Sequence, residues 1–239
     1  MIDESIVTFK SPKSHVSEAY RMLRTNLQFL SLDSPAKVFL ITSAGPSEGK
    51  STTVANLAVT FAQSGNKVLI IDCDLRKPCI HKIFWITNRY GVTNAVFDKN
   101  KVDDYIQKVD VEDLFVLGCG PIPPNPSEIL GSNKMKTLLC YLKEIFDIIL
   151  IDSPPVGMVT DAQILSTLSD GTIIIAESGK VNVDALKRAK AMLEAVNAKI
   201  LGVILNNVHN INRESNGYYY YYKEYDDGQE VKNNKRKRK

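Results

Sequence analysis

Residues 37–51 read KVFLITSAGPSEGKS, an apolar run that leads directly into a short loop of small residues. Residues 37–43 are rich in aliphatic and aromatic side chains, which predicts a β-strand. Residues 49–64 predict a helix, because apolar side chains recur there at helical spacing, and Gly65 is expected to end it. The stretch therefore predicts a strand, a turn and a helix in succession.

The loop between this strand and helix matches the pattern G-x-x-x-x-G-K-[ST], with Ala in place of the first Gly. Small residues let backbone N–H groups surround phosphate oxygens, and the N-terminus of the helix adds partial positive charge. We expect Lys50 to reach the β- and γ-phosphates of ATP and the Ser51 hydroxyl to ligate Mg²⁺. The predicted ATP-binding residues here are Ala44, Gly45, Pro46, Ser47, Glu48, Gly49, Lys50, Ser51 and Thr52.

Acidic residues end two further apolar runs. Asp152 closes the run IILID and precedes Ser-Pro-Pro, a position from which an acid can hold Mg²⁺ through water. Asp72 and Asp74 follow the run KVLII, where two carboxylates are costly unless they meet a cation or hydrogen-bond donors. Plainer interpretations remain open: a turn-forming Asp before two prolines, and a solvated strand end in which an Asp pairs with Arg76.

More strands are predicted over residues 114–117, 172–176 and 199–205, with a helix over about 181–197. The strands are nearly continuous in Val, Ile and Leu, which is typical of strands buried on both faces of a parallel sheet. We therefore predict an α/β fold of the P-loop NTPase type: a mostly parallel sheet flanked by helices on both faces, with a flexible C-terminal tail. Ligands in such folds lie at the carboxyl ends of the strands.

An additional helix is predicted before the first strand. One face of this helix carries Glu18, Arg21 and Arg24, each three residues apart. Taken alone, this spacing favours a solvated face with one weak Glu–Arg pair over a contact between subunits. A second face is apolar and consists of Val16, Ala19, Tyr20, Leu23, Leu27 and Leu30.

The composition is that of an ordinary globular protein: 239 residues, of which 44% are hydrophobic. The net charge is +3, but residues 232–239 contain six Lys and Arg, so residues 1–231 carry −3 and do not suit nucleic-acid binding. The four cysteines form no CxxC pair, which favours reduced thiols of a cytosolic protein over a zinc site. We expect no signal peptide and no membrane-spanning helix.

Six of the ten tyrosines lie within eight residues near the C-terminus. A packed strand would not carry five consecutive tyrosines, because alternate side chains would face the wrong side. A low-complexity tail is the plainer interpretation, but a phosphate-binding loop in the same chain makes a target of phosphoryl transfer the stronger hypothesis. The predicted acceptors are Tyr218, Tyr219, Tyr220, Tyr221, Tyr222 and Tyr225.

Together these motifs resemble those of a known family. The loop Ala44–Ser51, the D-x-D-x-R segment Asp72–Arg76 and the segment Ile148–Pro155 look like those of bacterial tyrosine kinases of capsular or exopolysaccharide synthesis, of the Gram-positive cytoplasmic type. The segment Glu18–Leu27 resembles that family's E-x-x-R-x-x-R motif. Further similar stretches are LRKP from Leu75, with His81 and Phe84, and PPNPSEIL from Pro123.

The resemblance implies roles for the acidic residues of this chain. Lys50 and Ser51 would bind Mg²⁺·ATP, and Asp74 and Asp152 would hold Mg²⁺, largely through water. Asp72 would lie nearest the incoming tyrosine hydroxyl, as its base or orienter. Asn206, or its neighbour Asn207, is expected to contact the adenine.

The resemblance also implies partners. Glu18, Arg21 and Arg24 would form subunit contacts in a homo-oligomeric ring, and the tail tyrosines of one subunit would enter the site of its neighbour. Some members carry a fused membrane-spanning domain, and its absence here implies a separate membrane adaptor that recruits a cytoplasmic kinase to the inner face of the plasma membrane. A cognate phosphotyrosine phosphatase is expected, and no nucleic acid.

The predicted organisation is an N-terminal segment with an oligomerisation helix (1–36), a P-loop ATP-binding kinase domain (37–209) and a disordered Tyr-rich and basic tail (210–239). The expected function is trans autophosphorylation of the tail, which regulates polysaccharide synthesis and export. The alternatives are a P-loop ATPase of the partitioning or cell-division-positioning type and a nucleotide-gated binding module. Partitioning-type loops carry a Lys where this chain has Gly45.

Overall fold

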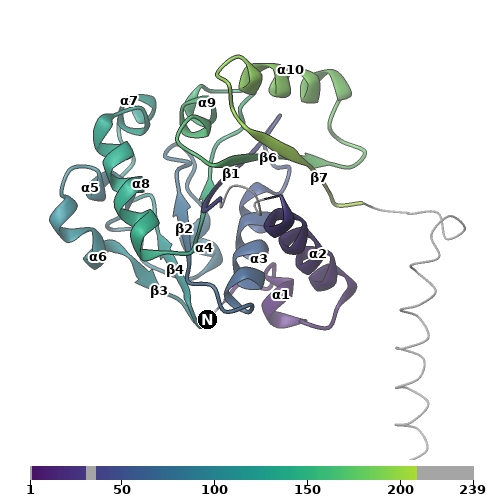
Figure 1. The fold of residues 1–239 in the computed structure, drawn as a ribbon, viewed down its shortest axis with the longest axis horizontal. Coiled ribbons are helices and arrows are strands. Elements are labelled where there is room, and N and C mark those ends of the chain that lie inside the picture. Colours follow the sequence, from purple (N-terminus) through teal and green to yellow (C-terminus); the bar gives the residue numbers. More distant parts are fainter. Residues whose placement is uncertain (1, 31–35, 209–239) are drawn as a thin grey trace, which may run out of the picture. The chain divides into compact units, whose positions relative to one another are not determined.

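The computed structural model of the chain describes residues 2–30 and 36–208, which contain one sheet of seven strands (Figure 1). The strand order is β3-β4-β2-β5-β1-β6-β7, and all neighbouring pairs are parallel except β3 with β4. The mostly parallel sheet that the sequence predicts is confirmed. The strands are β1 (Val38–Ser43), β2 (Val68–Asp72), β3 (Gln107–Lys108), β4 (Leu114–Leu117), β5 (Ile148–Asp152), β6 (Gly171–Glu177) and β7 (Ile200–Asn206).

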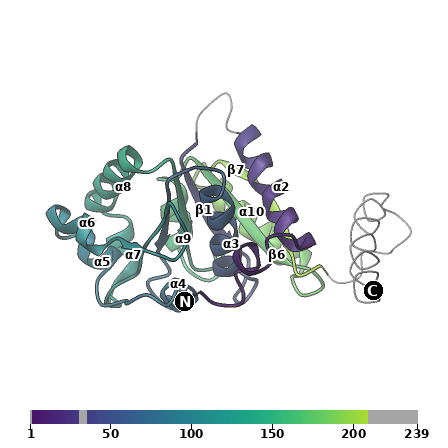
Figure 2. The same cartoon turned by 90° about the horizontal axis from the view of Figure 1, so that it is seen from below.

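Helices cover both faces of this sheet, as predicted, with α1, α2 and α3 on one face and α7 and α8 on the other (Figures 1 and 2). Short helices fill the connections between strands. The helices are α1 (Val7–Lys10), α2 (His15–Phe29), α3 (Lys50–Ala62), α4 (Ile80–Ile83), α5 (Val92–Ala95), α6 (Val102–Tyr105), α7 (Pro126–Leu130), α8 (Asn133–Ile145), α9 (Asp161–Ser166) and α10 (Val183–Glu194), with a 3₁₀ turn η1 (Lys99–Lys101).

Alternate side chains of each central strand enter two different cores, because successive residues of a strand point to opposite faces. In β1, Phe39 and Ile41 pack in the core beneath α3, whereas Val38 and Leu40 pack in the core beneath α8. All six residues of β1 are buried. The continuous apolar runs of the sequence therefore reflect burial on two sides.

Helix starts are fixed by local polar contacts. The Ser14 hydroxyl accepts the Ser17 N–H at the start of α2, and Ser132 accepts the Met135 N–H at the start of α8. Such caps satisfy donors that have no partner within the helix and typically stabilise it by about 1 kcal/mol. Gly65, in the left-handed region at φ 85°, follows the end of α3 as predicted.

Helix α3 is buried on nearly every side, not on one face alone. Ala55, Val59 and Thr60 are also buried, although they lie outside the apolar face predicted from the spacing of Val54, Leu57, Ala58, Phe61 and Ala62. The reason is that α3 lies against the sheet on one side while α1 and α2 pack against its outer side. A pattern read from one helix cannot show a second layer that covers it.

The prediction that every strand is buried on both faces is wrong for β7. Val203 and Leu205 are 50% and 58% exposed. This strand lies at the edge of the sheet and pairs only with β6 among the described residues, with a register irregularity between Thr172 and Ile173. The short strand β3, at the opposite edge, was not predicted because two polar residues carry no strand pattern.

The apolar face predicted for the N-terminal helix is also partly wrong. Val16, Ala19 and Leu30 are exposed, whereas Ser17 is buried. The Ser17 hydroxyl donates to the carbonyl of Ser11 at 2.7 Å, so a small polar residue, rather than Val16, turns toward the rest of the chain.

Three strands end side by side at one edge of the sheet. Asp72 at the end of β2 is the register partner of Asp152 at the end of β5, and β5 pairs in turn with β1, which ends at Ser43. The described residues up to Asn206 belong to one compact unit that includes α1 and α2. The division at residue 36 remains a prediction, and the predicted tail lies outside the described residues. No helix among the described residues is long and apolar enough to cross a membrane.

Candidate nucleotide site

The loop between β1 and α3 turns sharply at the end of the sheet. Gly49, the residue before α3, lies in the left-handed region at φ 88°. A Cβ atom at this position would overlap the side-chain amide of Asn206. Glycine is therefore required here by both conformation and space.

Three contacts brace the loop: one from within it, one from the end of β7 and one from the turn that follows β6. The Gly45 N–H donates a short hydrogen bond to Glu48 Oε1, and Asn206 Nδ2 donates to the Glu48 carbonyl at 3.0 Å. Lys180 Nζ donates to the Ser47 carbonyl at 2.9 Å. Burial raises the pKa of Glu48, whose Oε2 has no hydrogen-bond partner in the described part of the chain.

Ser51, the second residue of α3, connects the loop to the neighbouring acidic strand end. Its hydroxyl donates a short hydrogen bond to Asp152 Oδ2 and accepts the Cys79 thiol at 3.0 Å. The other oxygen of Asp152, Oδ1, is buried with no partner among the described residues. Burial raises the pKa of Asp152 to about 7, against the hydrogen bond from Ser51 and the charge of Lys50.

Asp72 is fully buried beside Asp152 and accepts backbone donors on both oxygens. Oδ2 accepts the N–H groups of Cys79 and Ile80 at 3.1 Å each, and Oδ1 accepts the Asp74 N–H at 3.3 Å. Burial, followed by the charge of Asp152, raises the pKa of Asp72 well above its usual value. Neighbouring buried carboxyl groups disfavour each other's charged form, and a cation beside them would reduce that cost.

A cleft of about 490 Å³ opens at this edge of the sheet. Its lining includes Lys50, Ser51 and Asp74, together with Arg76 and the exposed side chain of Met158. The predicted residues that line it are Pro46, Ser47, Gly49, Lys50, Ser51, Thr52 and Asp74; those that do not are Ala44, Gly45, Glu48, Asp72, Asp152 and Asn206. Asp72 and Asp152 support the lining from the protein interior.

The donor set at this edge fits Mg²⁺. Carboxylate and hydroxyl oxygens are its preferred ligands, and it normally keeps several waters and takes phosphate oxygens as well. Asp152, with one unpartnered buried oxygen, meets the Ser51 hydroxyl, and Asp74 lines the same cleft. No group of three or more His, Cys, Asp or Glu suited to a metal occurs in the described ranges.

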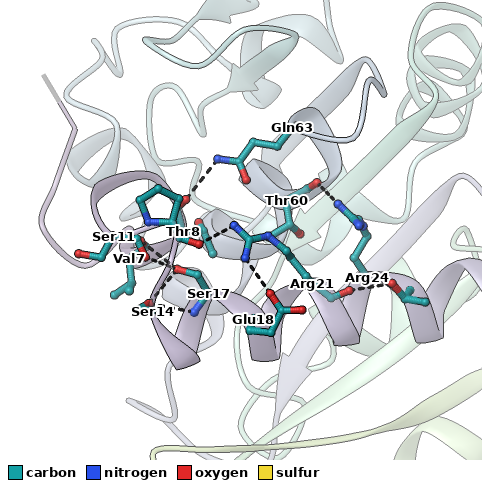
Figure 3. A network of polar contacts seen from close by, with 12 residues as sticks. Val7, Thr8, Ser11, Ser14, Ser17, Glu18, Arg21, Arg24, Thr60 and Gln63 are labelled. Atoms are coloured by element: carbon teal, nitrogen blue, oxygen red, sulfur yellow. Dashed lines mark hydrogen bonds and ion pairs between the residues drawn. The ribbon is translucent and has the colours of Figure 1, made fainter. Parts of the chain in front are cut away.

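The polar face of α2 makes its visible contacts within the chain (Figure 3). Arg21 Nη1 pairs with Glu18 Oε2 at 2.8 Å, as the spacing predicts, and Arg24 Nη1 donates to the Thr60 carbonyl of α3 at 2.9 Å. Arg24 is half-buried, so this face is only partly solvated. A subunit contact through these residues remains a prediction, and the six predicted acceptor tyrosines lie outside the described residues.

The sequence did not single out several residues that the fold brings to the cleft or into contact with its lining. Cys79 contacts Ser51, and Lys180 reaches the loop from beyond the end of β6. Asp161, at the start of α9, is fully buried and pairs with Arg76. An Asp at the start of a helix is too common a pattern to single out, and only its burial shows that it matters.

Comparison with known proteins shows which family has this sequence and fold. A family model described as ParA, NUBPL iron-transfer P-loop NTPase, matches residues 35–237. The tyrosine-protein kinase YwqD of Bacillus subtilis (strain 168) is 44% identical over 205 residues, which are 86% of this chain and 86% of that protein. P-loop NTPase architecture, predicted from the sequence, is thereby confirmed.

Solved structures agree with this assignment. The chimerical protein CapA2B2 superposes with a TM-score of 0.83 at 41% identity, covering 87% of this chain and 92% of that one. The kinase domain of the Escherichia coli tyrosine kinase ETK gives a TM-score of 0.82 at 32% identity, covering 89% and 83%. On the strength of the braced phosphate loop, the paired acidic strand ends and these likenesses, the chain belongs to the bacterial tyrosine-protein kinase family of P-loop NTPases.

Proposed function

We propose that this chain transfers the γ-phosphoryl group of ATP to tyrosine hydroxyl groups, and that its own C-terminal tyrosines are acceptors. The observation that carries the proposal is the meeting of Ser51 with Asp152 beside Lys50, at a cleft that Asp74 also lines. This is the arrangement needed to bind a phosphate chain with its cation. The 44% identity to a named tyrosine-protein kinase supports tyrosine as the acceptor.

The residues of the chain act mainly by positioning and by charge. The loop Ala44–Gly49 and the N-terminus of α3 would bind the phosphates, with Lys50 at the β- and γ-phosphates. Ser51, Asp74 and Asp152 would hold Mg²⁺, directly or through water, and the ion supplies charge neutralisation on the phosphate oxygens.

In the transfer itself, the tyrosine oxygen forms a bond to the γ-phosphorus while the bond from that phosphorus to the bridging oxygen of ADP breaks. The family resemblance makes Asp72 the carboxylate proposed to orient the hydroxyl or to accept its proton, although Asp72 lies behind the cleft lining in this structure. A tyrosine hydroxyl has a pKa near 10, so it needs such a base or orienter as the bond forms. The backbone donors on Asp72 would fix its carboxyl plane for this task.

The proposed acceptors are Tyr218–Tyr222 and Tyr225, and the transfer occurs between copies of the chain. The clustering of these tyrosines beside acidic residues supports their assignment. A ring built through Glu18, Arg21 and Arg24 would bring the tail of one copy to the cleft of the next. Asn206 or Asn207 would contact the adenine.

At the cellular level we propose regulation of capsular or exopolysaccharide synthesis and export. A separate membrane adaptor would recruit this cytoplasmic protein to the inner face of the plasma membrane, and a phosphotyrosine phosphatase would reverse the labelling. The likeness to CapA2B2, a chimerical protein, supports the pairing of such a chain with a second component.

The test is to incubate the purified chain with Mg²⁺ and ATP and to examine the C-terminal peptide by mass spectrometry. We expect phosphate on tyrosines of residues 218–225. Release of inorganic phosphate without any phosphotyrosine would instead support the ATPase alternative. Nucleotide binding with neither product would support a nucleotide-gated binding module.

A further inference from the structure

Arg76 occupies a place in the cleft that the proposed mechanism does not use. It follows β2 in the segment whose acids are Asp72 and Asp74, and it lines the cleft together with Lys50 and Ser51. Its side chain is 38% exposed, so it is in part accessible from the cleft. The Asp74 carboxylate accepts the backbone N–H of Arg76 at 3.3 Å and that of Lys77 at 2.9 Å, which folds this loop tightly.

A fully buried carboxylate holds the Arg76 guanidinium from behind. Arg76 Nε donates to Asp161 Oδ2 at 2.8 Å and Nη2 donates to Asp161 Oδ1 at 3.0 Å, which is a bidentate pair. The Ser127 hydroxyl donates to the same Oδ1 at 2.8 Å and accepts Arg76 Nη2 at 3.2 Å. Such two-point pairing fixes the plane of a guanidinium as well as its position.

The three partners come from three separate connections at the carboxyl edge of the sheet. Arg76 follows β2, Ser127 is the second residue of α7 after β4, and Asp161 is the first residue of α9 after β5. The bonds to Asp161 and Ser127 use Nε and Nη2 of the guanidinium and leave Nη1 for another acceptor. The hydrogen bond that Arg76 donates to Asp161 raises the pKa of Arg76, which therefore stays charged.

We propose that Arg76 is a further catalytic residue, which donates to an oxygen of the γ-phosphoryl group, and that Asp161 and Ser127 are its positioning residues. The proposal rests on the proposed phosphoryl transfer. Lys50 is expected at the β- and γ-phosphates, so a cation that lines the same cleft beside Asp74 lies at the phosphate end of the nucleotide. An arginine held in this way stabilises charge that spreads over the phosphoryl oxygens during transfer.

A simpler role for the cluster would be to join the three connections without touching the nucleotide. The two roles differ in their effect on nucleotide preference. A residue that contacts the γ-phosphoryl group contributes to the binding of ATP but not of ADP. A purely structural ion pair affects both nucleotides alike, or neither.

The experiment measures dissociation constants for Mg²⁺ with a non-hydrolysable ATP analogue and for Mg²⁺ with ADP. Arg76→Ala is expected to weaken binding of the ATP analogue by about 10-fold and binding of ADP by less than about 2-fold, since one charged hydrogen bond is lost. The ratio of the two dissociation constants should shift in the same direction in Asp161→Asn, but by a smaller factor. Arg76→Lys should not restore it, because an ammonium cannot pair bidentately with Asp161.

The matched control is Lys143→Ala, which breaks the 2.9 Å ion pair with Asp170. Asp170 also accepts the backbone N–H groups of Lys37 and Val38 at the start of β1, so this pair lies at the opposite edge of the sheet. The Lys143→Ala variant should leave the ratio of the two dissociation constants unchanged. Melting temperatures of all variants, measured alongside, show that each chain is folded.

The proposal would be overturned if Arg76→Ala lost affinity for both nucleotides equally, or lost affinity for neither. Turnover provides the second readout: tyrosine labelling at saturating ATP should fall about 1,000-fold or more in Arg76→Ala, within the range known for such arginines. If the unsubstituted chain labels no tyrosine, the proposed function fails, while the ratio of the two nucleotides still decides the role of Arg76.

Discussion

The Ser51 hydroxyl donates a hydrogen bond to Asp152 Oδ2, although 101 positions separate the two residues in the chain. Ser51 is the second residue of the helix that follows the phosphate loop, and Asp152 ends the strand β5. The contact exists because β1 and β5 are parallel neighbours whose carboxyl ends share one edge. It brings a hydroxyl and a carboxylate together where a metal–phosphate complex needs them.

Lys50 should be essential for labelling and dispensable for folding. Lys50→Met keeps a linear side chain of similar length but removes the charge at the phosphates, so self-labelling should fall by about 100-fold or more. Phosphotyrosine is measured by mass spectrometry, and circular dichroism checks the fold. Lys187→Met, on the exposed side of α10, is the matched control and should label normally. Persistent labelling of the Lys50→Met chain would remove Lys50 from the mechanism.

Metal-free protein should lose stability as the pH rises from about 4 to about 7. Burial raises the pKa of Asp152 to about 7, so the folded chain holds a proton there that the unfolded chain, with an ordinary carboxyl, has released. Stability is then greatest while Asp152 is protonated and falls as pH rises toward its folded pKa, by up to about 1.4 kcal/mol per pH unit. Denaturant titrations in EDTA at several pH values measure this slope.

Asp152→Asn is the informative variant for that titration. An amide carries no charge at any of these pH values. The free energy of unfolding should therefore fall less steeply with pH, and the variant should be more stable than the parent at pH 8. Asp184→Asn, at an exposed position of α10, should keep the parent slope. A parent chain whose stability rises over this pH range would show that the buried carboxyl does not titrate as described.

Asn206 should contribute to nucleotide binding through the loop. Asn206→Ala removes the 3.0 Å hydrogen bond to the Glu48 carbonyl, and the loss of about 1 kcal/mol should weaken nucleotide binding about fivefold. Because the bond braces the phosphate loop, affinities for ATP and GTP should fall together. A loss confined to ATP would instead support the adenine contact that the family resemblance implies.

A substitution on the charged face of α2 should affect assembly of the chain but not its folding. Arg21→Ala breaks a partly exposed pair with Glu18 whose contribution to stability is at most about 1 kcal/mol, so the melting temperature should change little. If the face forms subunit contacts, light scattering should nevertheless show loss of the oligomer. Arg188→Ala, on α10, is the control and should keep the assembly. An unchanged oligomer in Arg21→Ala would argue against a ring through this residue.

The strand ends that carry the site could be predicted from the sequence, because apolar runs closed by Asp72 and Asp152 indicate both a buried strand and the edge where it stops. The exposure of Val203 could not be predicted, since it depends on β7 lying at the edge of the sheet. Asp161 could not be found either. Its importance comes from burial and from a partner, Arg76, that lies 85 positions away in the chain.

In the proposed function, one copy of the chain phosphorylates the tail of another. A chain with Lys50→Met and an intact tail is mixed with a chain that has an intact site and Phe at Tyr218–Tyr222 and Tyr225, in the presence of Mg²⁺ and ATP. Mass spectrometry distinguishes the two tails. We predict no label on either chain alone and phosphotyrosine on the Lys50→Met tail in the mixture. Absence of label in the mixture, with the unsubstituted chain labelling itself under the same conditions, would contradict transfer between copies.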